Sequence, residues 1–151
     1  LEWDKVPLAK NIPTLELPIE GAPSATGMGN PHCTFFVEDA EKINLEEMGP
    51  KFENHPLFPE RTNVQFASIS SPDRIRMRVW ERGVGVTLAS GSSSCATAVS
   101  ANRRGLTGKN VQIELDGGIL DINWREDGVW MTGPTMQVFS GHFSDEFLKS
   151  L

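Results

Sequence analysis

Apolar and polar residues alternate most regularly in two stretches of the chain. In "RIRMRVWERG", Ile75, Met77 and Val79 fall on one face of an extended chain, and arginines occupy the other face. This pattern predicts a half-buried strand that ends at Gly83. "NVQIELDGGILDINWRE" contains two alternating runs on either side of an Asp-Gly-Gly turn at 116–118, which predicts a β-hairpin.

Shorter apolar runs that are interrupted by Pro and Gly predict further strands. We expect strands over 14–19 and 32–37 on either side of a turn through 21–30, and a short strand in "TNVQFASI". "DGVWMTGPTMQVFSGHF" adds a turn and one more strand. About five to seven strands are therefore expected in total.

Two segments have helical patterns. "DAEKINLEEMGPKFENHPLF" has Asp39 as a cap and Gly49-Pro50 as the end of its helix. "SSSCATAVSANRRG" is a helix of small residues that begins with serine hydroxyls and ends at Gly105. Because small side chains let surrounding strands approach closely, we expect this helix to lie centrally rather than on the surface. The elements together predict an α+β domain in which a strongly curved, barrel-like sheet packs around a central helix.

Composition narrows the range of partners. The 151 residues suffice for one domain with its own core. The formal net charge of -6 disfavours nucleic acid and anionic membranes as partners, and no apolar run is long enough to span a bilayer. Cys33 and Cys95 are too few for a disulfide framework or a zinc site, so we expect no metal and a reducing, cytoplasmic location. The chain begins without Met, and we expect it to be part of a longer protein.

Ser90 lies in a glycine-rich turn directly before the small-residue helix. Gly91 and Ser92 follow it and would present free backbone N–H groups, which together with the helix dipole favour an anion. Because the turn lacks the lysine and the second glycine of a nucleotide-binding P-loop, a carboxylate is a better guest than a nucleoside triphosphate. A plain helix cap without a ligand explains the same residues equally well.

Polar residues elsewhere supply further candidates. Glu81 and Arg82 end the alternating strand and point to opposite faces, so that Arg82 could bind a carboxylate bidentately; a surface ion pair is the alternative. Asn30, held extended by the proline that follows, could offer its amide to a ligand, and His32 could carry a proton or orient a neighbour. Asn63 opens an apolar strand, where capping a turn is the alternative to binding a ligand.

Three motifs, "GNPHC", "NVQF" and "WERGVGVTLASGSSSCATAV", follow one another at the spacing of a known family. The chain resembles the C-terminal half of diaminopimelate epimerases over nearly its whole length, so that residues 1–151 would form one C-terminal domain. The resemblance implies two pseudo-symmetric halves, each a barrel-like sheet around a central helix, with the substrate between them.

The resemblance also implies a function. It implies a cofactor-independent cytoplasmic isomerase of lysine and peptidoglycan precursor biosynthesis, which interconverts LL- and meso-2,6-diaminopimelate by two-base proton transfer. The implied partners are LL-2,6-diaminopimelate and the N-terminal half of the same protein, and a homodimer is left open. Nucleic acid, a membrane and a metal are not implied.

The family pattern assigns roles to the candidate residues. Residues at substrate-binding positions are Asn30, Asn63, Glu81, Arg82, Gly91 and Ser92. Glu81 and Arg82 match residues that hold ammonium and carboxylate groups of the substrate, whereas Gly91 and Ser92 match the backbone donors at the helix start. His32 and Glu81 match positions that support the proton-transfer groups, which makes them catalytic candidates beside Ser90.

Ser90 is the departure from the family, because it stands where the family has its catalytic cysteine. A hydroxyl is far less acidic than a thiol and is a poor base at neutral pH unless it is activated. Cys95 lies inside the helix, about one turn past its start, and cannot reach the same point, so it is expected to be a small core residue. Ser90 is then an engineered substitution, a natural residue of an enzyme with one thiol and one hydroxyl, or the mark of a paralogue with weakened activity.

Two other functions compete with an epimerase. A proline racemase-like isomerase or dehydratase shares the two-half plan, but the Asn-Pro-His and Glu-Arg-Gly motifs argue against it. A non-catalytic amino-acid-binding paralogue would keep the anion-holding turn and lack the base, and Ser90 favours this alternative. We expect the isolated chain to be inactive and to expose an apolar face where the missing half would bind.

Overall fold

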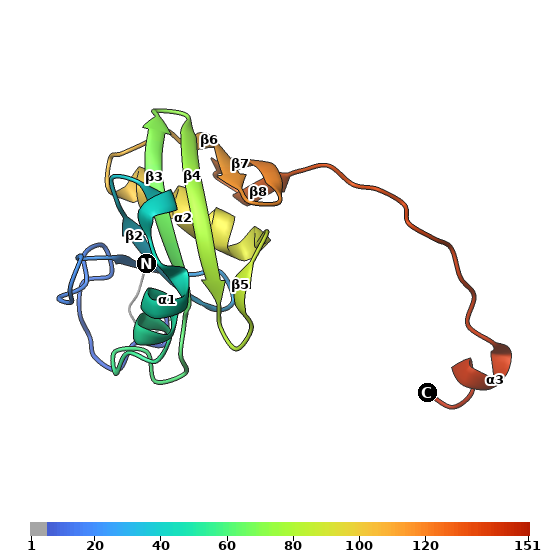
Figure 1. Cartoon of the computed structure of the whole chain (residues 1–151). Helices are drawn as coiled ribbons and strands as arrows, with labels where there is room; N and C mark the ends of the chain where they lie inside the picture. Colours follow the sequence, from blue (N-terminus) through green and yellow to red (C-terminus); the bar gives the residue numbers. More distant parts are fainter. Residues whose placement is uncertain (1–5) are drawn as a thin grey trace.

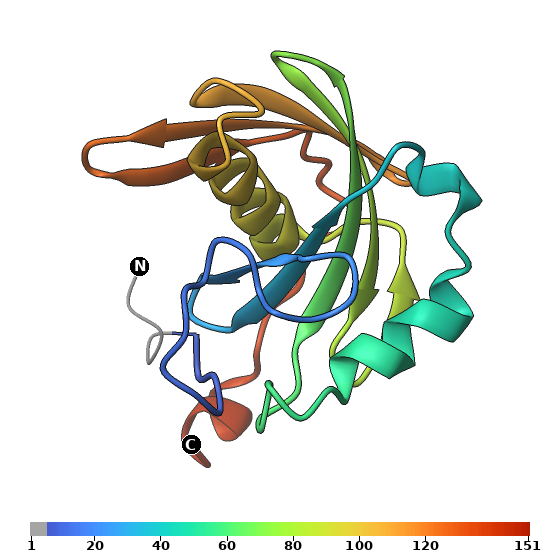
Figure 2. The ribbon, with the colours of Figure 1, turned by 90° about the vertical axis from the view of Figure 1, so that its left-hand side faces the viewer.

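The computed structural model describes residues 6–151, and one curved sheet dominates it. Within these residues the sheet has eight strands, and Figure 2 shows it curling around the helix α2. The strands are β1 (Ser24–Gly27), β2 (Pro31–Phe36), β3 (Asn63–Ser71), β4 (Arg74–Glu81), β5 (Gly85–Thr87), β6 (Asn110–Leu115), β7 (Gly118–Arg125) and β8 (Gly128–Thr132). The helical segments are η2 (Ala40–Lys42, a 3-10 turn), α1 (Leu45–Glu53), α2 (Gly91–Arg103) and α3 (Asp145–Leu148). The predicted α+β fold with a central helix is confirmed.

Strand order places the beginnings of β2 and β3 beside the end of β4. The order is β1-β2-β3-β4-β6-β7-β8, with β5 paired to β4. Because β2 and β3 are parallel, His32 pairs with Asn63 at the start of both strands. β4 is antiparallel to β3, and β5 folds back on β4 so that Glu81 pairs with Gly85. The start of β2, the start of β3 and the end of β4 therefore meet at one end of the strands, at the lower end of β4 in Figure 1. Polar residues of these three strands lie there, beside the β4–β5 turn.

Helix α2 lies inside the curve of the sheet and is largely buried. Its buried residues are small: Ser93, Ser94, Ala96, Thr97, Ala98, Val99, Ser100 and Ala101. Ala98 and Ala101 pack in one cluster with Ile75, Met77 and Ile113 of the surrounding strands. Interiors are packed as densely as organic crystals, so a helix enclosed by strands on several sides has room only for short side chains. The predicted central position is confirmed.

The end of α2 is set by Gly105, as predicted. Gly105 adopts φ = 71°, a left-handed conformation that glycine takes without steric cost. Its N–H donates to the Asn102 carbonyl (2.9 Å), and the Leu106 N–H donates to the Ala101 carbonyl (2.9 Å). These two bonds form a Schellman motif, which satisfies carbonyls at the end of the helix.

A second core covers the other face of β2 and β3. Along β3, Val64 and Phe66 pack with Phe52 of α1, whereas Ala67 joins the cluster around α2. Gln65 lies between Val64 and Phe66 in sequence and therefore points to the α2 side, because successive side chains of a strand face opposite ways. The alternation predicted for β4 is also confirmed, since its three apolar residues at 75, 77 and 79 are buried.

The prediction of a strand over residues 14–19 is wrong. These residues form bends, because Pro13 and Pro18 have no backbone N–H and the Leu17 N–H donates to the nearby Pro23 carbonyl (2.8 Å) rather than to a neighbouring strand. A strand forms instead inside the predicted turn over 21–30, where β1 pairs antiparallel with β2. The strand predicted over 32–37 is confirmed as β2 within one residue at each end.

The helix predicted after Asp39 is split in two, and it does not end at Gly49-Pro50. Asp39 caps only η2, by accepting the Glu41 N–H at 3.0 Å. After a break, α1 begins at Leu45 and continues without interruption through Pro50. The local stop signal was therefore overridden.

Packing explains why α1 passes through the glycine and the proline. Gly49 lies against the Trp80 ring, where a Cβ would come within 2.3 Å of Cδ2, so this glycine allows a close approach rather than ending the helix. Leu45 and Phe52 are 3% and 1% exposed. Burial of two such side chains contributes about 1.5–3 kcal/mol each, which offsets the cost of about 3 kcal/mol for proline inside a helix.

The short strand β5 was not predicted, and it brings the count to eight within the described residues, above the expected range. Three residues are too few to show alternation, so the sequence pattern carries no signal for β5. The strand exists because the β4–β5 turn reverses the chain, with Gly83 at φ = 75° and Gly85 at φ = 103°. The predicted hairpin of β6 and β7, and the further strand β8, are confirmed.

Beyond β8 the chain leaves the sheet. Residues 133–151 extend away from the domain as an exposed segment that contains α3 (Figure 1). Met136, Val138 and Phe139 in this segment are 86%, 82% and 83% exposed. Over residues 6–151, no helix is both long and apolar enough to cross a membrane.

Candidate active site at the start of helix α2

Ser90 is the N-cap residue of α2 and is only 6% exposed. Its Oγ lies 2.9 Å from Glu81 Oε2 and 2.9 Å from Ser93 Oγ. A carboxylate can only accept, so the Ser90 hydroxyl is the donor to Glu81, and the same hydroxyl is the donor in the contact with Ser93. The end of β4 and the start of α2 thus bring two predicted catalytic residues, Ser90 and Glu81, into direct contact.

Glu81 is held between two hydroxyl groups. Thr87 Oγ1 donates to Glu81 Oε1 at 2.6 Å, while Ser90 donates to the other oxygen. Thr87 ends β5 opposite Val79, so it lies on the same face of the sheet as Glu81, two residues further along β4. Thr87 was not predicted as a site residue, because β5 was not predicted as a strand.

The backbone N–H groups at the start of α2 have no protein acceptor. The Ser90 carbonyl accepts the first bond of the helix (3.0 Å), and the Ser90 side chain makes no capping hydrogen bond. Within residues 6–151, the N–H groups of Gly91, Ser92 and Ser93 therefore remain unbonded. They lie at the positive end of the helix dipole, a geometry that favours an anion, and the anion site itself stays a prediction.

His32 is fully buried at the start of β2. Its Nε2 lies 2.9 Å from Asn30 Oδ1, and its Nδ1 lies 3.0 Å from Gln65 Nε2. Burial, together with the positive charge of Arg82, lowers the pKa of His32 to about 4. His32 is thus neutral at pH 7, and its position favours the orienting role over that of a proton carrier.

The stability of the chain is expected to depend on the protonation of His32. The pKa is 6.5 for an ordinary histidine and about 4 for His32 in the folded chain, so the unfolded state binds more protons between these values. The stabilising contribution is fully present above pH 6.5 and is lost as the pH falls through about 4; it amounts to about 3 kcal/mol.

Urea denaturation of the 151-residue chain at several pH values would measure this loss. His32→Gln should flatten the acid limb of the profile, whereas His142→Gln, at an exposed position in the C-terminal segment, should not. An equally steep acid limb in the His32→Gln chain would contradict the prediction.

The side chains of Asn63 and Arg82 form hydrogen bonds with backbone groups. Asn63 Nδ2 donates to the Pro31 carbonyl (3.0 Å), and its Oδ1 accepts the Arg82 N–H (2.9 Å). The Arg82 guanidinium donates to the Glu60 carbonyl (3.0 Å). Asn63 thus has the turn-stabilising role that was the alternative to ligand binding, although its Nδ2 carries a second hydrogen that this bond does not use.

Gln65 and Ser93 complete the polar network, and neither was predicted. Both are fully buried, and Gln65 Nε2 donates to Ser93 Oγ at 3.0 Å, which links β3 to α2. Two signals together could have found them. Alternation places Gln65 on the same face of β3 as Asn63, and Ser93 follows Ser90 by three residues, close to one helical turn.

Glu53 holds the β4–β5 turn from the α1 side. It is 5% exposed, and it accepts hydrogen bonds from Trp80 Nε1 (2.6 Å), the Gly83 N–H (2.9 Å) and Arg61 Nη1 (3.0 Å). A buried carboxylate is tolerated when its oxygens are bonded in this way. Glu53 therefore positions the turn that carries Arg82, and no local pattern indicated it because its partners lie on other elements.

The two thiols lie away from the network. Cys33 is fully buried in the core that α1 covers, and burial raises its pKa. Cys95 packs against the cluster around α2, and burial raises its pKa as well. A raised pKa disfavours the reactive thiolate. Cys95 was expected to be a small core residue, and it is partly buried at the margin of the core. Neither thiol forms a disulfide within the described residues.

Exposed apolar side chains flank the start of α2. They are Leu88 (67% exposed), Met131 (49%) and Ile119 (41%), whereas the exposed Val86 (44%) pairs with Trp80 on the face that α1 covers. Met131 lies over the helix start, since a Cβ added to Gly91 would come within 3.1 Å of its sulfur. The structure therefore has exposed apolar side chains beside the site, as expected for a face that another part of the protein would cover.

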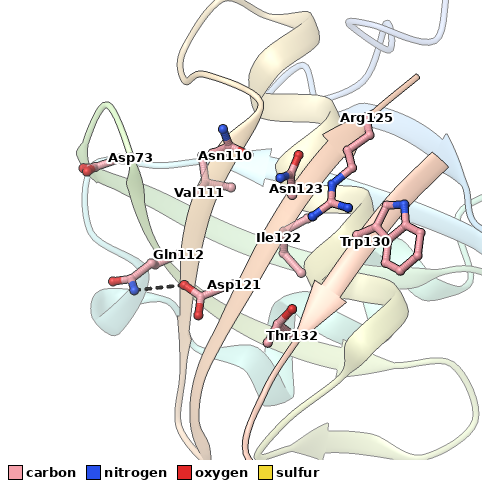
Figure 3. A pocket seen from close by; sticks show the side chains of 10 residues that line it. All are labelled: Asp73, Asn110, Val111, Gln112, Asp121, Ile122, Asn123, Arg125, Trp130 and Thr132. Atoms are coloured by element: carbon pink, nitrogen blue, oxygen red, sulfur yellow. Dashed lines mark hydrogen bonds between the residues drawn. The ribbon is translucent and has the colours of Figure 1, made fainter. Parts of the chain in front are cut away.

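A pocket of about 530 Å³ lies elsewhere, on the β6, β7 and β8 surface that faces away from α2 (Figure 3). Gln112, Asp121 and Asn123 line it and alternate with residues that pack toward α2. None of its lining residues belongs to the Ser90 network. Across residues 6–151, no group of three or more His, Cys, Asp or Glu side chains could hold a metal ion.

Comparison with known proteins identifies the same family that the sequence motifs resemble. The family model for diaminopimelate epimerase matches residues 24–138. The diaminopimelate epimerase of Rhodospirillum centenum is 52% identical over 98% of this chain, and that of Acidiphilium cryptum is 51% identical over 98%. The chain spans about half the length of these relatives, 53% and 55% respectively.

Solved structures share the fold. A phenazine biosynthesis protein of the PhzF family from Bacillus anthracis is 27% identical, with a TM-score of 0.50 over 72% of this chain and 37% of that protein. A putative PhzC/PhzF protein from Clostridium difficile has a TM-score of 0.56 at 16% identity, over 80% of this chain and 44% of that protein, and it shows the fold alone. Because the family model covers most of the chain and the relatives share half of its residues, the chain belongs to the diaminopimelate epimerase family.

Proposed function

We propose that residues 1–151 are the C-terminal domain of a diaminopimelate epimerase and form one half of a site that interconverts LL- and meso-2,6-diaminopimelate. The observation that carries this proposal is the contact of 2.9 Å between Ser90 and Glu81, directly beside the unbonded N–H groups of α2. The proposed enzyme is a cytoplasmic, cofactor-independent isomerase of lysine and peptidoglycan precursor biosynthesis. Membership of the family supports this function.

The start of α2 is the proposed site for the carboxylate next to the reacting carbon. The N–H groups of Gly91 and Ser92 would donate to it, and the helix dipole would favour its charge. When the α-hydrogen leaves as a proton, negative charge develops on the α-carbon and spreads onto this carboxylate. Donors that are already in place stabilise that charge without reorganisation.

Side chains around the helix start would bind the remaining polar groups. Glu81 is the proposed partner of a substrate ammonium group, and Arg82 that of a carboxylate. Asn30 and Asn63 lie at the starts of the parallel strands and would contribute amide hydrogen bonds. Two carboxylates and two ammonium groups make diaminopimelate a match for such a mixed set of donors and acceptors.

Inversion needs a base on one face of the α-carbon and an acid on the other. The base accepts the proton as the C–H bond breaks, and the acid delivers a proton to the opposite face. Ser90 occupies the position of one of these groups, with its hydroxyl oriented by Glu81. An ordinary carboxylate is too weak a base to remove a serine proton at neutral pH, so Ser90 is a poor substitute for a thiolate.

A non-catalytic amino-acid-binding protein is the second candidate function. Ser90 favours it, because the N–H groups at the start of α2 are unbonded while residue 90 lacks a basic group. Binding of diaminopimelate without exchange of its α-hydrogen would identify this function. No comparable observation favours the proline racemase-like alternative.

The N-terminal half of the same protein is the proposed partner. Its position would be over the apolar side chains near the start of α2, among them Leu88 and Met131, which are 67% and 49% exposed. Apolar groups gathered on one face indicate a surface that is covered in the working protein. A homodimer of the complete protein is compatible with this arrangement.

Binding measurements test the proposed function without requiring turnover. Calorimetric titration of the full-length protein is expected to show binding of LL- and meso-diaminopimelate and none of L-proline. Arg82→Met should weaken binding by about tenfold or more, because hydrogen bonds to charged groups contribute about 1.5–3 kcal/mol.

A matched arginine provides the control for this titration. Arg104→Met should leave the affinity unchanged, because Arg104 pairs with Glu16 at the other end of α2. Failure of both diaminopimelate isomers to bind would refute the proposed function. Binding of proline in their place would favour the racemase-like alternative.

A further inference from the structure

Gln65 is the branch point of the buried hydrogen-bond network beneath Ser90. It is fully buried on β3, and its Oε1 accepts the Thr34 hydroxyl at 3.1 Å. Its Nε2 lies 3.0 Å from His32 Nδ1 and 3.0 Å from Ser93 Oγ. Each hydrogen of the amide nitrogen therefore serves a different branch, one toward His32 and one toward the start of α2.

The hydroxyl group of Thr34 determines which way the Gln65 amide faces. Thr34 Oγ1 donates to Gln65 Oε1, which places the amide nitrogen on the side of Ser93 and His32. Ser93 Oγ accepts from both Gln65 Nε2 and the Ser90 hydroxyl, and it lies 3.5 Å from His32 Nδ1. A rotated amide would turn its NH2 group toward Thr34 and leave the Thr34 hydroxyl hydrogen without this acceptor.

The amide nitrogen that faces Ser93 also faces His32, and it can only donate there. His32 Nδ1 is therefore an acceptor, and the proton of the neutral ring is on Nε2. The Nε2–H group donates to Asn30 Oδ1 at 2.9 Å. With its oxygen occupied, Asn30 offers only its NH2 group to a ligand, and two donors without an acceptor suit a carboxylate.

We propose that Gln65 is a positioning residue: its amide selects the Nε2–H tautomer of His32 and thereby presents the NH2 group of Asn30 to a carboxylate of the substrate. Gln65 does not touch the substrate and acts through His32. The identity of the substrate rests on the proposed function, whereas the tautomer does not.

Nitrogen-15 NMR of the histidine side chains in the full-length protein measures the tautomer. The unmodified protein should show His32 as the Nε2–H form at neutral pH. Gln65→Glu replaces the amide donor with acceptor oxygens, so Nδ1 should become protonated, as the Nδ1–H form or the imidazolium. Gln65→Met has a similar shape without polar atoms, and it should give a mixture of both neutral tautomers.

A surface glutamine is the matched control. Gln112→Glu makes the same chemical change at an exposed position that donates to Asp121, and it should leave the His32 signals unchanged. An Nδ1–H form in the unmodified protein would overturn the proposal, because the Gln65 amide would then be rotated. Unchanged Nε2–H signals in the Gln65→Met protein would overturn it as well, whether or not the glutamate variant folds.

Binding of LL-diaminopimelate tests the second step, from His32 to Asn30. Asn30→Ala should weaken binding by about tenfold, the equivalent of one net hydrogen bond. Gln65→Met should weaken it by about twofold, because a mixture of tautomers leaves about half of the protein in the binding-competent form. The double variant should bind no more weakly than Asn30→Ala alone, because both changes remove the same contact. Additive losses would overturn the route through Asn30. If the unmodified protein shows the expected tautomers and binds no diaminopimelate, the proposed function fails while the control of His32 by Gln65 is upheld.

Discussion

Replacing Ser90 with cysteine in the full-length protein is expected to accelerate deuterium entry at the α-carbon of LL-diaminopimelate by about 10²–10⁴-fold, the usual contribution of a general base. A thiol has an ordinary pKa of about 8.5, and a position at a helix N-terminus lowers it. Residue 90 is the N-cap of α2 and would place a thiolate beside the unbonded N–H groups. The serine hydroxyl stays protonated at neutral pH. NMR in heavy water measures the exchange in both proteins.

The remaining thiol near the site provides the control. Cys95→Ser in the Ser90→Cys protein should leave the exchange rate unchanged, because Cys95 packs against the cluster around α2 and lies about one turn past the helix start. Equally fast exchange and inversion by the serine protein would contradict the prediction and would make Ser90 an activated natural base. Activity of the cysteine form alone would identify Ser90 as the mark of a disabled or engineered site.

The isolated 151-residue chain is expected to lack epimerase activity, at least about 10³-fold below the full-length protein, even with Ser90→Cys. Inversion requires an acid on the opposite face of the α-carbon, and the proposed source of that acid is the N-terminal half. Loss of a general acid costs about 10²–10⁴-fold, and loss of the enclosing surface removes further orientation of the substrate. Conversion of LL- to meso-diaminopimelate, followed by chiral chromatography, measures the difference.

Adding the separately produced N-terminal half is the matching experiment. It should restore activity in the Ser90→Cys chain if the two halves associate through the apolar side chains around α2. Charging that face with Leu88→Glu should prevent the restoration, because Leu88 is 67% exposed and lies beside the site. Measurable epimerisation by the purified chain alone would show that the second acid lies within these 151 residues.

Local chemistry explains which features could be predicted from the sequence. The alternation of Ile75, Met77 and Val79 predicted β4 and its buried face, because side-chain direction in a strand depends only on position. Small residues predicted the central place of α2, and Gly105 predicted its end, because a left-handed residue is a local requirement. The contact between Ser90 and the start of α2 follows from the same local rules.

Interactions between elements explain what could not be predicted from local patterns. The apolar run over 14–19 forms no strand, because β1 pairs with β2 instead, to which a short turn joins it. The stop signal at Gly49-Pro50 was overridden because Trp80, from another element, packs directly against Gly49. In the helix a packing partner far along the chain outweighed the local preference, whereas in the strand the pairing of β1 with the nearby β2 did so.

The site itself shows most clearly which features the sequence determined and which the tertiary structure decided. The sequence alone determined the residue types that meet at the start of α2, because Ser90, Glu81 and Asn30 each sit in a motif whose chemistry is readable over a few positions. Only the tertiary structure decided that Gln65 joins His32 to Ser93, and that Glu53 holds the turn before β5. The physical reason is that each of these bonds joins elements separated along the chain, so its existence depends on strand order and on the position of α2 within the sheet.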